Sequence, residues 1–590
     1  MADNHALSSE KHITGSVLVS GAASGELLVS DVGISFWGGV DPLNGNVIDE
    51  HHPLFGENVS GKVLVIPSGR GSCSGSGALL ELLINDCAPA ALVFTEAEDI
   101  LTLGVLVAEA MFDRSLPVLR ISTADSKQLV TGAEVAISHS KLQLSNNELS
   151  PPSSGNQPPV YAAATDTSHI SLSRHDQQVL NGLFGDAAKM AMQIILRIAT
   201  IQGADRLIDV HQAHIDACIY HGPSSLKFAQ ELLKRNAKVR IPTTLNSISI
   251  DERRWQDHGV DKQMGIPASQ LAYAFIEMGA RASYTCAPYL LSTAPVFGEQ
   301  IVWAESNAVM FANSVIGART QKYPDFLDIF IALTARAPAS GGHLDAGRNP
   351  TVCIQVPTIK SPDDSFWPLL GYHVGLKTPN ELPMIYGLEA LQPSMDDLKA
   401  FSAAFATTSS ASMFHIHSVT PEAELADQYC ELNGLLEDFH MVTMEQLLGS
   451  FKKLNTAQTP AVDMICLGNP HFSITECEKL VNLCHEKTKH DRVRLLITMG
   501  RDVYDSACEA GYVTRLESFG VEFITDTCWC MITEPVIPES AKHLMTNSGK
   551  YAHYGPALVK RDMHFGSLSA CVDAACNSVN SMVYPQWLSE

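Results

Sequence analysis

Residues 62–66 read Lys-Val-Leu-Val-Ile and lead directly into the loop Pro67-Ser-Gly-Arg-Gly-Ser-Cys-Ser-Gly75. The short apolar run predicts a buried strand, and the apolar stretch 78–84 after the loop predicts a helix. The alternation continues with a predicted strand at 91–94, a helix at 100–110 and a strand at 117–121. Strands that alternate with helices indicate parallel pairing in an α/β sheet.

A segment rich in Ser, Asn and Pro separates this region from the rest of the chain. Residues 145–159 read SNNELSPPSSGNQPP and show no apolar period. We therefore expect a linker at 145–165, between a small domain at 1–144 and a larger α/β part at 166–590.

The larger part opens with a predicted helix that begins after the N-cap Ser173 and stops at Gly203. Predicted strands follow at 206–210, 238–241, 282–284, 300–303, 462–467, 493–498 and 521–524. Each strand leads into a polar loop, and Ser473 with Glu476 forms a capping box for a helix after one of them. Because ligands bind at the carboxyl ends of strands in open α/β sheets, these loops are the candidate site.

The composition and charge of the chain argue against several classes of protein. The 590 residues carry 40 Lys+Arg and 64 Asp+Glu, a net charge of −24, which argues against nucleic acid or an anionic membrane as the main partner. No apolar run reaches the length of a membrane span, and the N-terminus has no signal-peptide pattern, so we expect a cytoplasmic protein. The 14 cysteines are then expected to be thiols, most of them buried.

A few cysteines lie where chemistry is expected. Cys286 and Cys528 come shortly after predicted strands, and Cys530 would face the same way as Cys528 in an extended chain. Thiolates at strand ends can hold a soft metal or an iron–sulfur cluster, but there is no CxxC pair and buried structural thiols remain the alternative.

Two other motifs have a functional and a structural interpretation. The loop 69–77 could receive an anion at the following helix, or be a flexible turn, and it lacks the Lys of a P-loop. The stretch 546–556 contains Lys550, which could clamp a carboxylate or phosphate or simply be solvated. His415, His417, His471 and His553 could act as acids, bases or ligands, or be structural.

Taken together, these motifs resemble the aconitase X family of the aconitase superfamily. The resemblance in the small domain lies in residues 34–42, 52–54 and 69–74. In the larger part it lies in residues 172–205, 244–246, 284–289, 303–306, 419–423, 468–471, 526–528 and 546–550. It implies an aconitase-like, multi-layer catalytic part with parallel and mixed sheets, plus a smaller β/α swivelling domain.

The resemblance also implies an activity. Members are hydro-lyases that carry an iron–sulfur cluster; the single-chain type dehydrates cis-3-hydroxy-L-proline, and the two-subunit type dehydrates mevalonate 5-phosphate. Because this chain is fused, with its small domain first, we expect the proline derivative as substrate and 1-pyrroline-2-carboxylate as product. The alternatives are mevalonate 5-phosphate dehydration, a metal-free α/β lyase or isomerase, and a non-catalytic α/β small-molecule-binding protein.

Residue by residue, the resemblance makes Ser72 the catalytic base and Cys286 and Cys528 cluster ligands. The third family cysteine falls at Asn469, so Cys530 or Cys466 is expected to replace it, and a 2Fe–2S cluster is expected, with other nuclearities open. The expected substrate-binding residues are Arg70, His214, Asp216, Cys218, Asn246, Ser247, Glu305, Ser306 and Lys550. The expected partner is a small hydroxy amino acid.

Overall fold

The computed structural model describes residues 12–50, 52–70, 73–144 and 167–589. The chain forms two compact units. The first comprises Met1–Arg70, Ser74–Ser171 and Gln193–Arg206, and the second comprises Gly71–Cys73, Leu172–Met192 and Leu207–Glu590. The predicted linker at 145–165 lies outside the described residues, so the domain boundaries stay a prediction. In the described ranges, no helix is both long and apolar enough to cross a membrane.

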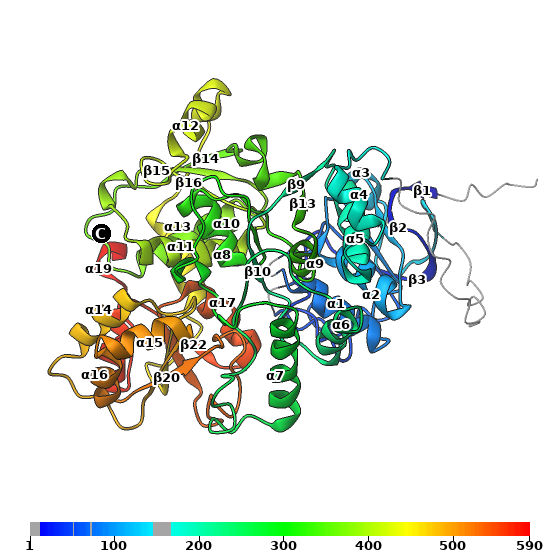
Figure 1. Ribbon diagram of the computed structural model, residues 1–590. Helices are drawn as coiled ribbons and strands as arrows, with labels where there is room; N and C mark the ends of the chain where they lie inside the picture. The colour runs from blue at the N-terminus through cyan, green and yellow to red at the C-terminus, as the bar shows by residue number, and fades with distance from the viewer. Residues whose placement is uncertain (1–11, 51, 71–72, 145–166, 590) are drawn as a thin grey trace, which may run out of the picture. The chain divides into compact units, whose positions relative to one another are not determined.

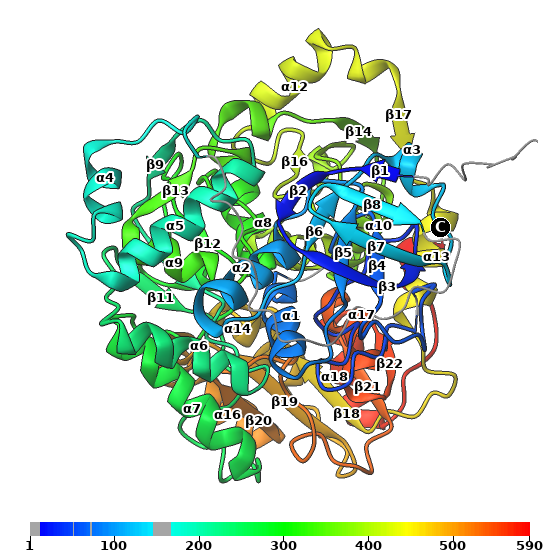
Figure 2. The same cartoon turned by 90° about the vertical axis from the view of Figure 1, so that its right-hand side faces the viewer.

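The first unit is built on one eight-stranded sheet, in the order β1-β8-β7-β3-β4-β5-β6-β2 (Figure 2). Its elements are β1 (His12–Thr14), β2 (Ser16–Val19), β3 (Ala22–Val29), β4 (Val63–Ile66), α1 (Gly75–Ile84), β5 (Ala91–Phe94), α2 (Ile100–Phe112), β6 (Val118–Arg120), α3 (Thr123–Ser126), β7 (Glu134–Ser138) and β8 (Lys141–Leu144). Strands β3 to β6 pair in parallel, which confirms the predicted alternation. β4 and β5 are buried at every residue, because apolar runs without alternation suit a parallel sheet covered on both faces.

The second unit contains several smaller sheets, most of them parallel. Their orders are β11-β10-β12, β16-β15-β14-β17 and β20-β19-β18-β21-β22, all parallel, and the antiparallel pair β13-β9. The strands are β9 (Leu207–Asp209), β10 (Ala213–Ile215), β11 (Thr243–Leu245), β12 (Val302–Trp303), β13 (Arg336–Pro338), β14 (Val352–Gln355), β15 (Pro383–Tyr386), β16 (His415–Ile416), β17 (Phe439–Met441), β18 (Met464–Leu467), β19 (Arg494–Met499), β20 (Val521–Thr525), β21 (His543–Thr546) and β22 (Asp562–Phe565).

Helices alternate with these strands along the chain. They are α4 (Arg174–Leu180), α5 (Asp186–Ile201), α6 (Pro223–Lys234), α7 (Lys262–Glu277), α8 (Ser306–Phe311), α9 (Leu327–Thr334), α10 (Phe366–Lys377), α11 (Met395–Thr408), α12 (Ala423–Leu432), α13 (Met444–Leu454), α14 (Ile474–Cys484), α15 (Arg501–Glu509), α16 (Tyr512–Phe519), α17 (Gly549–Val559), α18 (Leu568–Asn577) and α19 (Gln586–Ser589). Figure 1 shows α14, α15 and α16 grouped near β20. The predicted capping box of Ser473 and Glu476 starts α14. Ile465 of β18 lies opposite Leu495 of β19, and both belong to one apolar core.

Three predicted elements were wrong in detail. The helix predicted from Ser173 to Gly203 is two helices, because Gly182 and Gly185 between α4 and α5 have φ of 79° and 94°, in the left-handed region. Residues 238–241 form no strand; the N–H groups of Val239 and Arg240 donate instead to Met278 and Ala332.

The third error concerns the segment before the first candidate thiol. Residues 282–284 form no strand, since Tyr284 has a φ of 42°, which extended backbone does not allow. The turn at Tyr284 brings Thr285 and Cys286 into the interior of the second unit, where both are buried.

Candidate active site

The predicted site residues of the second unit follow parallel strands at their carboxyl ends, as the α/β rule requires. Asp216 and Cys218 follow β10, Asn246 and Ser247 follow β11, Glu305 and Ser306 follow β12, Asn469 and His471 follow β18, Cys528 and Cys530 follow β20, and Lys550 lies in α17 after β21. Most of them are buried. The side chains below show which of these loops meet.

Three cysteine thiols come together in this part of the fold. The thiol of Cys528 is in hydrogen-bonding contact with Cys286 and with Cys530, and these two contacts lower the pKa of Cys528 well below that of an ordinary thiol. Burial, followed by the contact with Cys528, raises the pKa of Cys286. Cys528 is therefore the thiol of the group that loses its proton most readily.

The thiols form a row rather than a cage. Among residues 12–50, 52–70, 73–144 and 167–589, no three His, Cys, Asp or Glu side chains surround a single point as they would around one bound ion. The row of Cys286, Cys528 and Cys530, in which Cys528 contacts the other two, offers soft donors, and sulfur is the ligand that iron–sulfur clusters use.

His471 connects the loops that carry these thiols. Its backbone N–H donates to Cys286 Sγ at 3.3 Å, and its ring Nε2 lies 2.8 Å from the carbonyl oxygen of Thr527. A carbonyl only accepts, so Nε2 carries the proton and Nδ1 accepts from the Thr285 hydroxyl at 3.1 Å. Burial lowers the pKa of His471, which keeps the ring neutral. Thr285 and Thr527 directly precede Cys286 and Cys528, so one imidazole fixes both loops.

The residues before His471 explain why its loop lies so close to the backbone of Thr498. Gly468 has a φ of 95°, and a Cβ there would lie 2.1 Å from the carbonyl oxygen of Thr498. Only glycine fits that position. The next residue, Asn469, donates from Nδ2 to Cys530 Sγ at 3.3 Å. Asn469 therefore touches the thiol row without adding a thiol to it.

A buried ion pair lies beside the thiols. Lys550 Nζ donates to Glu305 Oε1 at 2.8 Å, and Glu305 also accepts from Asn307. Burial opposes both charges, but the charge of Glu305 raises the pKa of Lys550 well above its usual value, and Lys550 lowers that of Glu305. Asn307 Nδ2 also donates to the carbonyl oxygen of Cys286 at 3.0 Å, which links the pair to the thiol row.

A group of buried acids lies near this pair. Burial, and then the charges of Asp325 and Glu305, raise the pKa of Asp216 well above its usual value. Asp328 accepts from the Asp216 backbone N–H at 2.6 Å, and burial raises the pKa of Asp328 to about 6. The side chain of Asn246 donates to Asp216. Burial and the neighbouring charges thus favour the protonated form of Asp216, whereas Lys550 favours the ionised form of Glu305.

The remaining predicted residues of the second unit have varied surroundings. His214 Nδ1 lies 2.8 Å from Thr244 Oγ1, and burial lowers the pKa of His214 to about 4. Cys218 Sγ donates to the carbonyl oxygen of Ile215 at 3.3 Å, and Ser247 N–H donates to the Asn246 side chain at 2.7 Å. These hydrogen bonds are all within the protein, and they do not show what His214, Cys218 or Ser247 would bind.

The loop at residues 67–75 carries the predicted base, and the structure describes it except at residues 71 and 72. Ser72 lies outside the described residues. Its neighbour Cys73, which groups with the second unit, has its Sγ 3.6 Å from Ser306 Oγ. Arg70 belongs to the first unit, where it forms an ion pair with Asp49 at 3.4 Å and its side chain is 44% exposed.

The two candidates for the third thiol are in different places. Cys530 lies in the thiol row, whereas Cys466 lies in β18 and packs in an apolar core with Met464, Leu496 and Trp529. A side chain in the middle of that core does not reach the row.

Sequence reasoning missed Lys322, in the loop between Gly317 and α9. Its Nζ donates to the carbonyl oxygen of Ser409 at 3.0 Å, and the charges of Glu305 and Lys550 both act on it. The α/β rule points to loops after strands, whereas this loop follows the helical segment Ala312–Ile316. A lysine beside Tyr323 and Pro324 between two apolar helices was the signal that could have revealed it.

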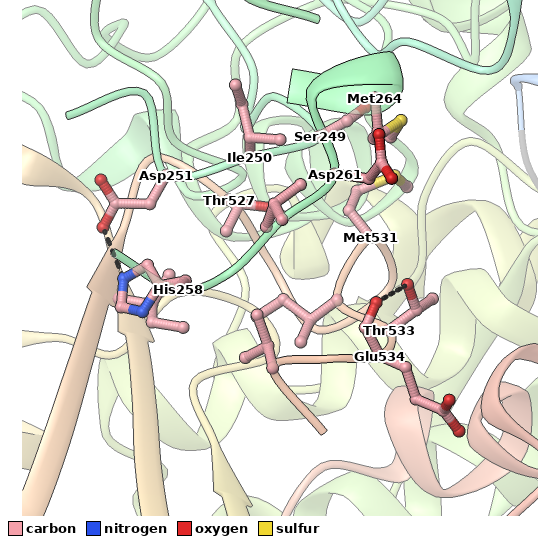
Figure 3. A pocket seen from close by; sticks show the side chains of 14 residues that line it. Ser249, Ile250, Asp251, His258, Asp261, Met264, Thr527, Met531, Thr533 and Glu534 are labelled. Carbon is pink, nitrogen blue, oxygen red and sulfur yellow. Dashed lines mark hydrogen bonds and ion pairs between the residues drawn. The ribbon is translucent and has the colours of Figure 1, made fainter. Parts of the chain in front are cut away.

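A separate cavity of about 140 Å³ adjoins the loop after Cys530. Figure 3 shows Met264, Met531 and Thr527 among its lining side chains, with His258 turned to Asp251 at one end. None of the predicted substrate residues lines it. The cavity is therefore distinct from the candidate site.

Models of one family match the chain along most of its length. The models described as Aconitase X swivel domain, first domain, second domain and third domain match residues 12–145, 169–346, 350–447 and 462–577.

Individual relatives match over nearly the whole chain. The chain is 50% identical to a protein of Hypocrea jecorina named cis-3-hydroxy-L-proline dehydratase, over 98% of this chain and 97% of that one. It is 49% identical to a protein of the same name from Pseudomonas aeruginosa, over 97% and 98%. A solved structure titled Thermococcus kodakaraensis aconitase X (holo-form) matches with a TM-score of 0.62 and 28% identity, over 69% of this chain and 100% of that chain.

Proposed function

Because the chain belongs to the aconitase X family, we propose that it is a hydro-lyase that dehydrates cis-3-hydroxy-L-proline to 1-pyrroline-2-carboxylate. The observation that carries this proposal is the 50% identity to a relative of that name, which extends over 98% of the chain and so includes both units. The geometry of the second unit supports it, because a row of thiols lies beside a buried ion pair of Glu305 and Lys550.

We propose that Cys286, Cys528 and Cys530 hold an iron–sulfur cluster, of the 2Fe–2S type. The donor set fits such a group, since three buried thiols are in contact and the pKa of Cys528 is lowered. When bound, the cluster would supply a Lewis acid for the departing hydroxyl group. Asn469 stands where the family has its third cysteine, and its donation to Cys530 supports Cys530 as the replacement.

The reaction needs a base for the proton on the carbon that bears the carboxylate. We propose Ser72 as this base and Arg70 as the cation that favours its alkoxide. Cys73, from the same loop, has its Sγ 3.6 Å from Ser306 Oγ, which supports a role for this loop at the substrate residues. Removal of that proton and loss of the neighbouring hydroxyl as water gives an enamine, which tautomerises to the cyclic imine.

The substrate is a zwitterion, and the site offers charges of both signs. We propose that Glu305 binds the ring ammonium, while Lys550 holds Glu305 ionised and turned to the substrate. Burial raises the pKa of Asp216, and in its protonated form this side chain can donate a hydrogen bond. His214, Cys218, Asn246, Ser247 and Ser306 complete the proposed substrate-binding set.

The proposal is tested by turnover with anaerobically purified protein and two substrates. Cis-3-hydroxy-L-proline should be converted, and mevalonate 5-phosphate should not; the reverse result would make the chain a phosphomevalonate dehydratase. Binding of either compound without turnover would indicate a non-catalytic binding protein. Ser72→Ala should abolish turnover and leave the visible spectrum unchanged, with Ser68→Ala from the same loop as control. Full activity of Ser72→Ala would remove Ser72 as the base.

A further inference from the structure

The ammonium group of Lys322 has little to bind in the described part of the chain. Its one hydrogen bond there is to the carbonyl oxygen of Ser409, at 3.0 Å, and it forms no ion pair among the described residues. An ammonium has three donors, so two of them are available for another acceptor. The side chain is half-buried, where an unpaired charge is costly until a partner arrives.

Lys322 faces the same region as the buried ion pair. The backbone N–H of Asp325, in the same loop, donates to the carbonyl oxygen of Cys73 at 3.2 Å, and Cys73 Sγ lies 3.6 Å from Ser306 Oγ. The charges of Cys73, Glu305 and Lys550 act on the Lys322 ammonium. The loop that carries it also carries Asp325, whose charge acts on Asp216. Lys322 therefore adjoins the proposed substrate residues from a different loop.

Lys550, by contrast, already forms an ion pair with a carboxylate of the protein. It donates to Glu305 at 2.8 Å, and both side chains are buried. A carboxylate that approached Lys550 would also meet the negative charge of Glu305 at close range. The second cation of this region, Lys322, offers a positive charge without an attached carboxylate.

We propose that Lys322 binds the carboxylate group of the substrate and thereby selects ring amino acids that carry one. This rests on the proposed function. The arrangement divides the zwitterion between two cations and one anion: Glu305 receives the ammonium, Lys550 keeps Glu305 ionised, and Lys322 receives the carboxylate. Negative charge that develops on the carboxylate as the neighbouring proton leaves is stabilised by the same contact.

The test combines kinetics with inhibition by unreactive analogues. Lys322→Met removes the charge at similar length, Lys322→Arg keeps it, and Lys360→Met alters an exposed lysine of the same unit as control. The holoenzyme variants are assayed with cis-3-hydroxy-L-proline, and inhibited with L-proline or L-prolinamide, which differ only at the carboxylate. Iron content and the visible spectrum report whether the cluster is retained.

In Lys322→Met we expect a KM raised about 10- to 100-fold, the effect of losing one charge-assisted hydrogen bond. The preference of the wild type for L-proline over L-prolinamide should disappear with it, and Lys322→Arg should restore part of it. Lys360→Met should match the wild type in both.

An unchanged KM and an unchanged analogue preference in a Lys322→Met enzyme that retains its cluster would overturn the proposal. If Lys322→Met does not fold, Lys322→Gln replaces it in the same assays. The wild type is tested as well: equal inhibition of the wild type by L-proline and L-prolinamide would contradict recognition of the carboxylate. Absence of wild-type turnover would contradict the proposed function, whereas wild-type turnover with an indifferent Lys322→Met contradicts only the role of Lys322.

Discussion

His471 Nε2 lies 2.8 Å from the carbonyl oxygen of Thr527, the residue before Cys528. Through its other ring nitrogen and its backbone N–H, the same residue reaches Thr285 and Cys286. Its own carbonyl oxygen accepts from the buried Lys399 at 3.3 Å. A single neutral imidazole thus sets the separation of the two thiol loops.

His471→Asn shortens the side chain, so that it cannot bridge Thr285 and Thr527 at once. We expect the cluster to be held about 10- to 100-fold less tightly, the usual effect of removing a partner that orients metal ligands. The measurement is the rate of loss of visible absorption in the presence of an iron chelator. The exposed His440→Asn serves as control, and equal rates for the two variants would show that His471 does not position the thiols.

Cys530→Ser and Cys466→Ser separate the two candidates for the third ligand. Cys530 lies in contact with Cys528, so its replacement should bleach the protein and lower its iron content. Cys466→Ser places a hydroxyl in an apolar core and should reduce stability by about 1–3 kcal/mol while the spectrum stays unchanged. Iron analysis and visible spectra of both variants show which cysteine is the third ligand. A bleached Cys466→Ser together with a normal Cys530→Ser would make Cys466 the ligand instead of Cys530.

Lys550→Met leaves the Glu305 carboxylate buried without its cation. The cost should be about 3–5 kcal/mol in the free energy of unfolding, because an unpaired charge remains in the interior. The double variant Glu305→Gln with Lys550→Met removes both charges and should regain most of that loss, yet stay inactive. Urea unfolding of the two single variants and the double variant measures the coupling. Strictly additive losses would mean that the ion pair contributes no coupling energy.

The contribution of His373 to stability should fall as the pH drops below 6.5, because this buried histidine stays neutral in the folded chain. Burial lowers the pKa of His373 to about 4 from 6.5. Between those values the unfolded chain binds a proton that the folded chain does not, so the free energy of unfolding decreases with decreasing pH. From pH 6.5 to 5 this group costs about 2 kcal/mol.

His373→Asn removes this titration. The difference in urea midpoint between pH 7 and pH 5 should be smaller in His373→Asn than in the wild type, while the exposed His440→Asn should behave as the wild type. An identical pH dependence in all three proteins would mean that His373 titrates normally in the folded chain.

Local patterns were sufficient to predict the elements that form from neighbouring residues. The apolar runs of β4, β5 and β18 lie within two residues of their predicted bounds, and the capping box of Ser473 starts α14 as expected. The segment 282–284 was wrong because Ala-Ser-Tyr has no turn residue to reveal the positive φ of Tyr284.

The site depends on contacts between distant segments, and these were beyond local patterns. Spacing alone did not associate Cys286 with Cys528; the family resemblance did. The choice between Cys530 and Cys466 required the side-chain surroundings, since both lie near predicted strand ends. Lys322 was missed because its loop follows no strand, and its relation to Glu305 depends on the tertiary fold.

The central claim is tested most directly by product analysis of anaerobically purified wild-type protein incubated with cis-3-hydroxy-L-proline. We predict loss of one water per substrate and formation of 1-pyrroline-2-carboxylate, by a protein that contains iron and sulfide. Unchanged cis-3-hydroxy-L-proline after incubation with cluster-loaded protein would contradict the account.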